Sequence, residues 1–259
     1  MKSTLSSLSV SEFAGAAWPA GVLSAGATVA WAAISGAVHG GTGWISTAMP
    51  AAAVLAGWLM LLMLLATMAA IMIAAQATRP AVTATGFGLI VLALVPPLVL
   101  ATISSGELPM LVVLRIVAIL AAWMLLCAAL TRLLHPLGPS VAVTTTATLA
   151  MTLLALPVVL MPLLADLTQW RDDRLLGLIV NACPVLWLLD GTDQALRFNW
   201  FWWSHARLMY QFTGLGQNTP MPVLQPWWEP TAISAALALG MLGLAECSVR
   251  KYFLRRPGP

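Results

Sequence analysis

The sequence predicts an all-α fold, a polytopic helical membrane protein with six transmembrane helices. Two observations predict it. Of the 259 residues, 60% are hydrophobic and only 8% are charged, whereas a soluble domain carries about 25% charged residues. The apolar residues also form runs close to the roughly 20 residues that a helix needs to cross about 30 Å of hydrocarbon. This composition excludes a disordered chain, a coiled coil and a nucleic-acid-binding protein.

Six apolar stretches are predicted to span the membrane. The first is rich in glycine and alanine, the second is the most apolar, and the third contains the pair Pro96 and Pro97. The fifth has a hydroxyl-rich first half, and Pro157 and Pro162 are expected to break its second half. The predicted spans are residues 13–38, 51–76, 82–104, 109–134, 140–165 and 230–249. No linker divides the chain, so residues 1–259 are expected to form a single transmembrane domain.

One connection is long, and it joins the fifth and sixth predicted spans at residues 166–229. Within it, residues 175–189 are apolar but too few to cross the bilayer, and they include Asn181 and Pro184. Irregular backbone at membrane depth is tolerated where other parts of the protein satisfy it. We therefore expect a re-entrant or interfacial helical segment here, with a seventh span as the alternative.

The positions of lysine and arginine orient the spans, because cytoplasmic loops carry an excess of these residues. Arginine outnumbers lysine by 10 to 2, which suggests a GC-rich bacterial genome. With both termini inside, the inner side holds Lys2, Arg79, Arg132, Arg250, Lys251, Arg255 and Arg256, and the outer side holds Arg171, Arg174, Arg197 and Arg207. The sequence thus predicts a multi-pass protein of the bacterial inner (cytoplasmic) membrane with cytoplasmic termini.

A tryptophan-rich stretch, residues 193–212, lies in the long outer segment. Arranged as a helix, it is amphipathic, and indole rings suit the membrane interface. Its function is either to anchor the chain on the outer leaflet or to cap a lipid-accessible cavity. Its candidate outer-face residues are Trp200, Trp202, Trp203, His205 and Arg207.

Arg115 places a charge inside the fourth predicted span, where charges are costly and often functional. It lies about 9 Å along the helix from Pro109. It can therefore extend to the outer interface or pair with Glu107. The alternative is a place on a cargo path or a contact between spans.

Motifs for catalysis and for cofactors are missing from the sequence. There is no P-loop, no HExxH and no GxSxG. The three cysteines have no metal-ligand spacing, and no predicted span holds a histidine pair for haem. The second, third and fifth spans have no ionisable residue in their apolar cores, which argues against an ion-coupled transporter. We expect no enzyme activity and no catalytic, cofactor or metal site.

Six spans in 259 residues, inner termini and a membrane-active segment before the last span resemble the ABC-2-type transporter permease family. Members have a broken, re-entrant hairpin between spans five and six. In this sequence LLGLIVNACPVLWLL, followed by DQALRFNWFWWSHARLMYQF, occupies that place, and Asn181 and Pro184 resemble the turn residues often found there.

The resemblance implies a permease subunit that forms a homo- or hetero-dimer and is driven by a separate cytoplasmic ATPase subunit. It implies export of a lipid-like or amphipathic cargo, with Arg115 and residues 200–207 on the outer face. Arg79 and Arg132 would contact the partner on the inner side.

Two other function classes remain open. The first is a non-catalytic membrane subunit or assembly factor, which would dock partners through residues 166–229. A membrane enzyme that acts on lipid is the third class, but the sequence has no recognisable catalytic set for it. In all three, the bilayer is an expected partner and nucleic acid is not.

Overall fold

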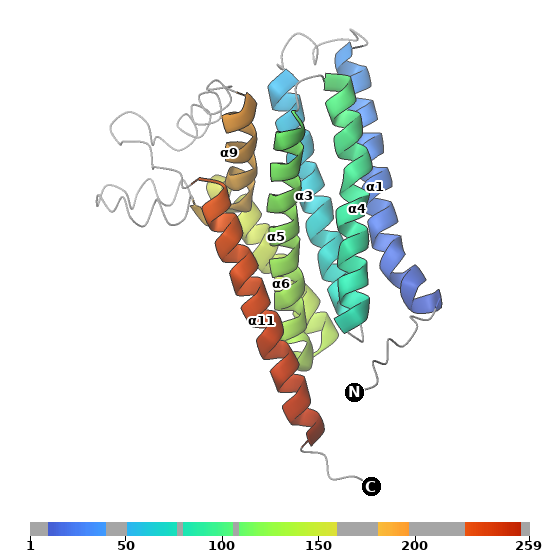
Figure 1. Cartoon of the computed structure of the whole chain (residues 1–259), viewed down its shortest axis with the longest axis vertical. Helices are drawn as coiled ribbons and strands as arrows, with labels where there is room; N and C mark the ends of the chain where they lie inside the picture. The colour runs from blue at the N-terminus through green and yellow to red at the C-terminus, as the bar shows by residue number, and fades with distance from the viewer. Residues whose placement is uncertain are drawn as a thin grey trace, which may run out of the picture.

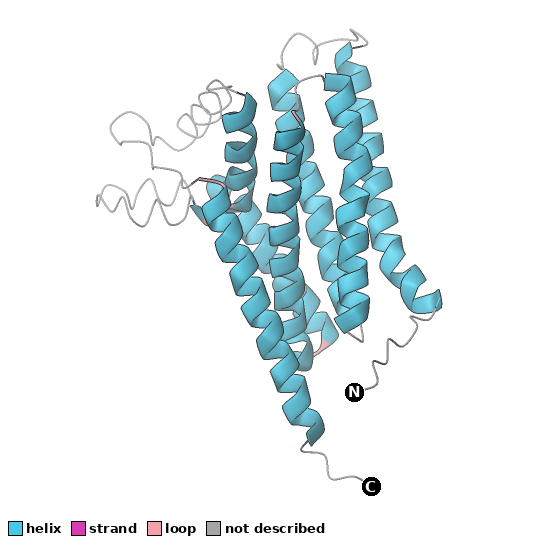
Figure 2. Cartoon of the chain, viewed as in Figure 1, coloured by secondary structure: helices cyan, strands magenta, loops and turns pink. Residues whose placement is uncertain are grey.

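The computed structural model describes residues 10–39, 51–76, 80–105, 109–159, 181–196 and 226–254. Within these ranges the chain is helical and contains no strand, which confirms the all-α prediction (Figure 2). The helices, in chain order, are α1 (Val10–His39), α3 (Ala51–Gln76), α4 (Pro80–Ser105), α5 (Met110–Leu134), α6 (Pro139–Val159), α9 (Pro184–Leu196) and α11 (Trp228–Leu254), with a short 3₁₀ turn, η1 (His135–Leu137), after α5.

Five of the described helices are long and apolar enough to cross a membrane: α1, α3, α4, α5 and α11. They coincide with the first four predicted spans and the sixth. Helix α6 coincides with the fifth, but its apolar part, Pro139–Ala155, is shorter than the other five, and residues 160–165 lie outside the described residues. A multi-pass helical membrane protein is therefore supported, and the count of six stays a prediction.

The long helices lie side by side in one bundle (Figure 1). Helix α1 packs against α4 and α3, while α5 contacts α11, α3, α9 and α6 and so connects most of the bundle. The first residue of α1, Val10, and the last residue of α11, Leu254, lie at the same end of the bundle (Figure 1). Helix α9 lies near the opposite end, beside α5 (Figure 1).

Helices α4 and α6 both contain internal prolines, and a break was predicted only for α6. Helix α4 continues through Pro96 and Pro97, and α6 continues past Pro157 to Val159. The break expected at Pro157 is therefore absent, and Pro162 lies outside the described residues. Neighbouring helices can satisfy the backbone groups that a proline frees, which is why such prolines are tolerated in membrane helices.

Four buried tryptophans, one on each of α1, α3, α5 and α9, lie between helices, and we call them the indole chain: Trp31, Trp58, Trp123 and Trp187. The ring of Trp58 on α3 meets that of Trp31 on α1 edge to face, with centroids 5.0 Å apart. The rings of Trp123 on α5 and Trp187 on α9 meet in the same way at 6.4 Å.

A buried indole N–H requires an acceptor, and Trp58, Trp123 and Trp187 find theirs across helices or turns. Trp58 donates to the carbonyl oxygen of Ala27 at 3.0 Å, and Trp123 donates to the hydroxyl of Thr67 at 2.8 Å. These bonds fix α1, α3 and α5 in a defined rotation about their axes, so that their buried faces meet.

Candidate functional site

Helix α9 begins at the residues where the sequence predicted a turn. The carbonyl oxygen of Asn181 accepts the indole N–H of Trp187 at 2.6 Å, which closes the turn onto the helix that follows it. The carbonyl of Cys183 accepts the N–H of Leu186 at 3.1 Å. Pro184 is the first residue of α9, where its missing N–H leaves no helical bond unmade.

Helix α9 is about two thirds of the length of a membrane span. Its 13 residues extend about 20 Å, whereas the hydrocarbon core is about 30 Å thick. Most of its described side chains are buried, and they pack mainly against α5, with further contacts to α3, α6 and α11. It is thus an internal element of the bundle, held between the spanning helices near one end.

Three polar or aromatic groups meet where α9 lies between α5 and the start of α11, and we call this place the junction: Arg115, Asp190 and Trp227. One carboxylate oxygen of Asp190, Oδ2, accepts the backbone N–H of Trp227 at 3.0 Å. The guanidinium carbon of Arg115 lies 5.7 Å from the centroid of the Trp227 ring, in a cation–π contact. The junction therefore ties a spanning helix, the short helix and the start of the last helix together.

Opposing effects set the charge of Asp190, which belongs to α9 and lies outside the five candidate spans. Burial raises the pKa of its carboxyl group above the ordinary value. The N–H of Trp227 and the positive charge of Arg115 both lower that pKa, but burial is the larger effect. Arg115 therefore acts on groups from two neighbouring elements, while Glu107, the partner that the sequence predicted, lies outside the described residues.

Gly191 allows the close approach on which the junction depends. A Cβ atom at this position would lie 3.0 Å from Cδ1 of Ile119 on α5 and 3.7 Å from Cγ of Trp227. Glycine inside a helix costs about 1 kcal/mol relative to alanine. The close contact with Ile119 and Trp227 supplies a packing reason for this glycine.

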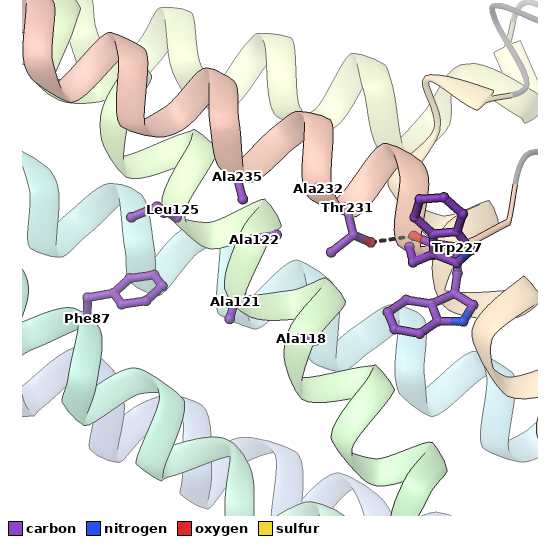
Figure 3. A pocket seen from close by; sticks show the side chains of 10 residues that line it. Phe87, Ala118, Ala121, Ala122, Leu125, Trp227, Thr231, Ala232 and Ala235 are labelled. Carbon is purple, nitrogen blue, oxygen red and sulfur yellow. Dashed lines mark hydrogen bonds between the residues drawn. The ribbon is translucent and has the colours of Figure 1, made fainter.

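An apolar groove of about 370 Å³ runs from the junction between α5 and α11, and α4 contributes to its far end. Figure 3 shows Trp227 at one end of the groove and Phe87 and Leu125 at the other. Small side chains line its middle, from both helices. The lining residues are Phe87, Ala118, Ala121, Ala122, Leu125, Trp227, Trp228, Thr231, Ala232 and Ala235.

The other candidate residues do not join this site. Arg132 lies in the last turn of α5, about 26 Å along the helix from Arg115. Its positive charge interacts favourably with the negative end of the helix dipole. Arg79 lies outside the described residues, as do the candidates of the tryptophan-rich stretch: Trp200, Trp202, Trp203, His205 and Arg207. The described site thus brings Arg115 together with the helix that Asn181 and Pro184 begin.

Sequence reasoning missed Asp190, Gly191 and Trp227. A signal was present for Asp190, because it is an acidic residue directly after the apolar run at residues 175–189 and so has the charge that Arg115 needs. Nothing in the sequence pattern indicated that Trp227, rather than another of the tryptophans, would contact both.

Among the described residues, no group of three or more histidine, cysteine or acidic residues is placed to hold a metal ion. Cys127 and Cys183 are both buried and not in a disulfide. No protein-family model, curated protein or solved structure matches this chain.

Proposed function

We propose that the chain is the membrane-spanning permease subunit of an ABC-type, ABC-2-like transporter, which exports a lipid-like or amphipathic cargo and is powered by a separate cytoplasmic ATPase subunit. The observation that carries the proposal is α9, a helix too short to span the membrane and buried against α5 before the last long helix. The re-entrant hairpin of the permease family occupies the corresponding place in the chain.

The proposal includes six spans, with α6 as the fifth and α9 as the returning arm of a hairpin that enters and leaves at the outer face. Two features support it. The 13 residues of α9 are too few to cross the bilayer. Helix α1 also begins at the end of the bundle where α11 finishes, as an even number of crossings requires (Figure 1).

In this proposal α5 connects the contact with the ATPase at the cytoplasmic face to the junction at the outer face. Its last turn carries Arg132, which, together with Arg79, contacts the ATPase at the cytoplasmic face. Its first turns carry Arg115 and the junction at the outer face. Movement imposed on one end of a well-packed helix reaches the other end, so α5 can pass the effect of ATP hydrolysis to α9 and α11. Two such subunits form a homo- or hetero-dimer in the bacterial inner membrane.

Gentle affinity purification from native membranes, followed by quantitative mass spectrometry, tests the proposal. We expect a P-loop ATPase in stoichiometric amount. Charge reversal at both inner positions, Arg79→Glu with Arg132→Glu, should reduce its recovery at least tenfold, because the contact would lose two cations. The matched control is Arg171→Glu, which reverses a charge of the predicted outer segment and should leave recovery unchanged.

Recovery with other membrane subunits and no ATPase would contradict the permease proposal. It would favour a non-catalytic membrane subunit or assembly factor that docks partners through residues 166–229. In that case the double reversal at Arg79 and Arg132 should leave the recovered partners unchanged, because docking would take place on the outer side.

A further inference from the structure

The guanidinium of Arg115 has hydrogen-bonding capacity that its described surroundings do not use. It carries five N–H donors and no acceptor. Its direct contact is with the Trp227 ring, and it makes no hydrogen bond or ion pair with any residue in the described part of the chain. Asp190 attracts it and balances part of its charge, but that carboxylate already accepts the N–H of Trp227. A half-buried guanidinium that makes no hydrogen bond to the described residues can bind a ligand that offers acceptor oxygens.

The position of Arg115 along α5 puts its long side chain within reach of the lipid headgroups. The apolar stretch Met110–Leu137 has 28 residues and extends about 42 Å, so each end passes the hydrocarbon core of about 30 Å by about 6 Å. Arg115 is about 7.5 Å beyond Met110, which places it close to the boundary between headgroups and hydrocarbon. Trp227 and Trp228 lie at the start of α11 beside it, and tryptophan favours this boundary.

The groove continues from this boundary into the hydrocarbon. Ala118 follows Arg115 by one helical turn on the same face, and Leu125 lies about 15 Å further along α5 than Arg115. Across the groove, Ala232 and Ala235 of α11 leave room between the two helices. The hydroxyl of Thr231 donates its proton to the carbonyl of Trp227, so it offers no free hydrogen-bond donor to the groove (Figure 3).

We infer that the groove binds one phospholipid of the surrounding bilayer, with its phosphate on Arg115 and one acyl chain between α5 and α11. A guanidinium matches the oxygens of a phosphate in a bidentate arrangement, and the cation at the mouth of an apolar groove complements an anionic head with an alkyl tail. This inference concerns a bound lipid and holds whether or not the chain is a permease.

Native mass spectrometry of the full chain in mild detergent tests the inference, with phosphatidylglycerol and dioleoylglycerol added as probes. We expect one phosphatidylglycerol per chain, bound at least ten times more tightly than dioleoylglycerol, which has the tails without the phosphate. The Arg115→Gln variant should lose this tenfold preference, because it loses the charged donors. Ala232→Phe should weaken binding of both probes about tenfold, because the ring fills the groove.

The matched control is Ala236→Phe, since Ala236 is exposed one turn further along α11 and does not line the groove. It should bind phosphatidylglycerol as the unmodified chain does. Unchanged binding in both Arg115→Gln and Ala232→Phe would overturn the inference. If Arg115→Gln does not fold, Ala232→Phe decides alone, because Ala232 is exposed and its substitution leaves the core intact.

Two further outcomes overturn the choice of ligand. Equal binding of dioleoylglycerol and phosphatidylglycerol would show that the phosphate is not recognised. Displacement of phosphatidylglycerol by an equal concentration of oleate would show that the site takes a fatty-acid carboxylate.

Discussion

Replacing Thr67 with valine tests whether the indole chain holds the bundle together. Thr67 is fully buried on α3 and its hydroxyl makes two hydrogen bonds. It accepts the indole N–H of Trp123 at 2.8 Å and donates to the carbonyl of Met63 at 2.7 Å. The Thr67→Val variant keeps the shape of the side chain and removes the oxygen. It therefore leaves the N–H of Trp123, a residue only 2% exposed, without its acceptor.

The expected cost follows from the loss of this one bond. A buried donor left without its partner costs about 1–3 kcal/mol. Hydrogen bonds between membrane helices average about 0.6 kcal/mol and reach about 1.7 kcal/mol, because the unfolded state in the membrane also finds partners. We expect Thr67→Val to lower the free energy of unfolding by about 1–2 kcal/mol.

Thr131 on α5 provides a matched control. It is as fully buried as Thr67, and its hydroxyl likewise donates to the carbonyl four residues earlier, that of Cys127 at 2.8 Å. It accepts no indole N–H from the tryptophans that the structure describes. Thr131→Val should therefore change the free energy of unfolding by less than about 0.5 kcal/mol, because the carbonyl keeps its helical hydrogen bond.

Titration with dodecyl sulfate in mixed micelles, followed by circular dichroism, measures the unfolding free energy of each variant. In a Trp123→Phe background, which lacks the donor, Thr67→Val should cost little. Equal costs for Thr67→Val and Thr131→Val, or the same cost for Thr67→Val with and without the indole, would refute this account of the bundle.

Three further predictions concern α9. Gly191→Val should lower the unfolding free energy by about 2 kcal/mol in the same titration, because the valine side chain would overlap the fully buried Ile119. Gly191→Ala should be near neutral, because the higher helix propensity of alanine offsets the tight contact of its Cβ atom with Ile119. Because the pKa of Asp190 is raised in the folded state, its protonated carboxyl group contributes stability that is present below pH about 4 and is lost as the pH rises through the folded-state pKa. The melting temperature of the unmodified chain should therefore fall, relative to that of Asp190→Asn, between acidic and neutral pH. A constant difference between the two melting temperatures over this range would contradict the prediction. Burial raises the pKa of the Cys183 thiol to about 11, so it should resist maleimide at neutral pH, and Trp187→Phe should increase its labelling severalfold by releasing the turn before α9.

The positions of the long helices could be predicted from the sequence because hydropathy alone determines them. Runs of apolar residues are the direct consequence of crossing hydrocarbon, and α1, α3, α4, α5 and α11 lie where those runs lie. Proline gave a misleading signal in the fifth predicted span, because α6 continues past Pro157 to Val159. Local propensity predicts a break there, and packing in the bundle overrides it.

The junction could be predicted only in part, because it depends on which helix faces which. The sequence identified Arg115 as a costly charge, and Asn181 and Pro184 as a turn. It could not show that Asp190 and Trp227 meet beside Arg115, since the contact between Asp190 and Trp227 joins residues 37 apart in the chain. The rotation of each helix about its axis, which the buried indoles help to set, decides such contacts.

The permease proposal requires that α5 begins at the outer face and ends at the cytoplasmic face. Single cysteines at Met110 and Leu137 test this directly, because these residues are 69% and 68% exposed at opposite ends of the same apolar stretch. With the native cysteines replaced, an impermeant maleimide should label Met110→Cys in intact spheroplasts and Leu137→Cys only after permeabilisation. The reverse pattern would place the junction on the cytoplasmic side and Arg132 outside, and would contradict the proposed contact with an ATPase.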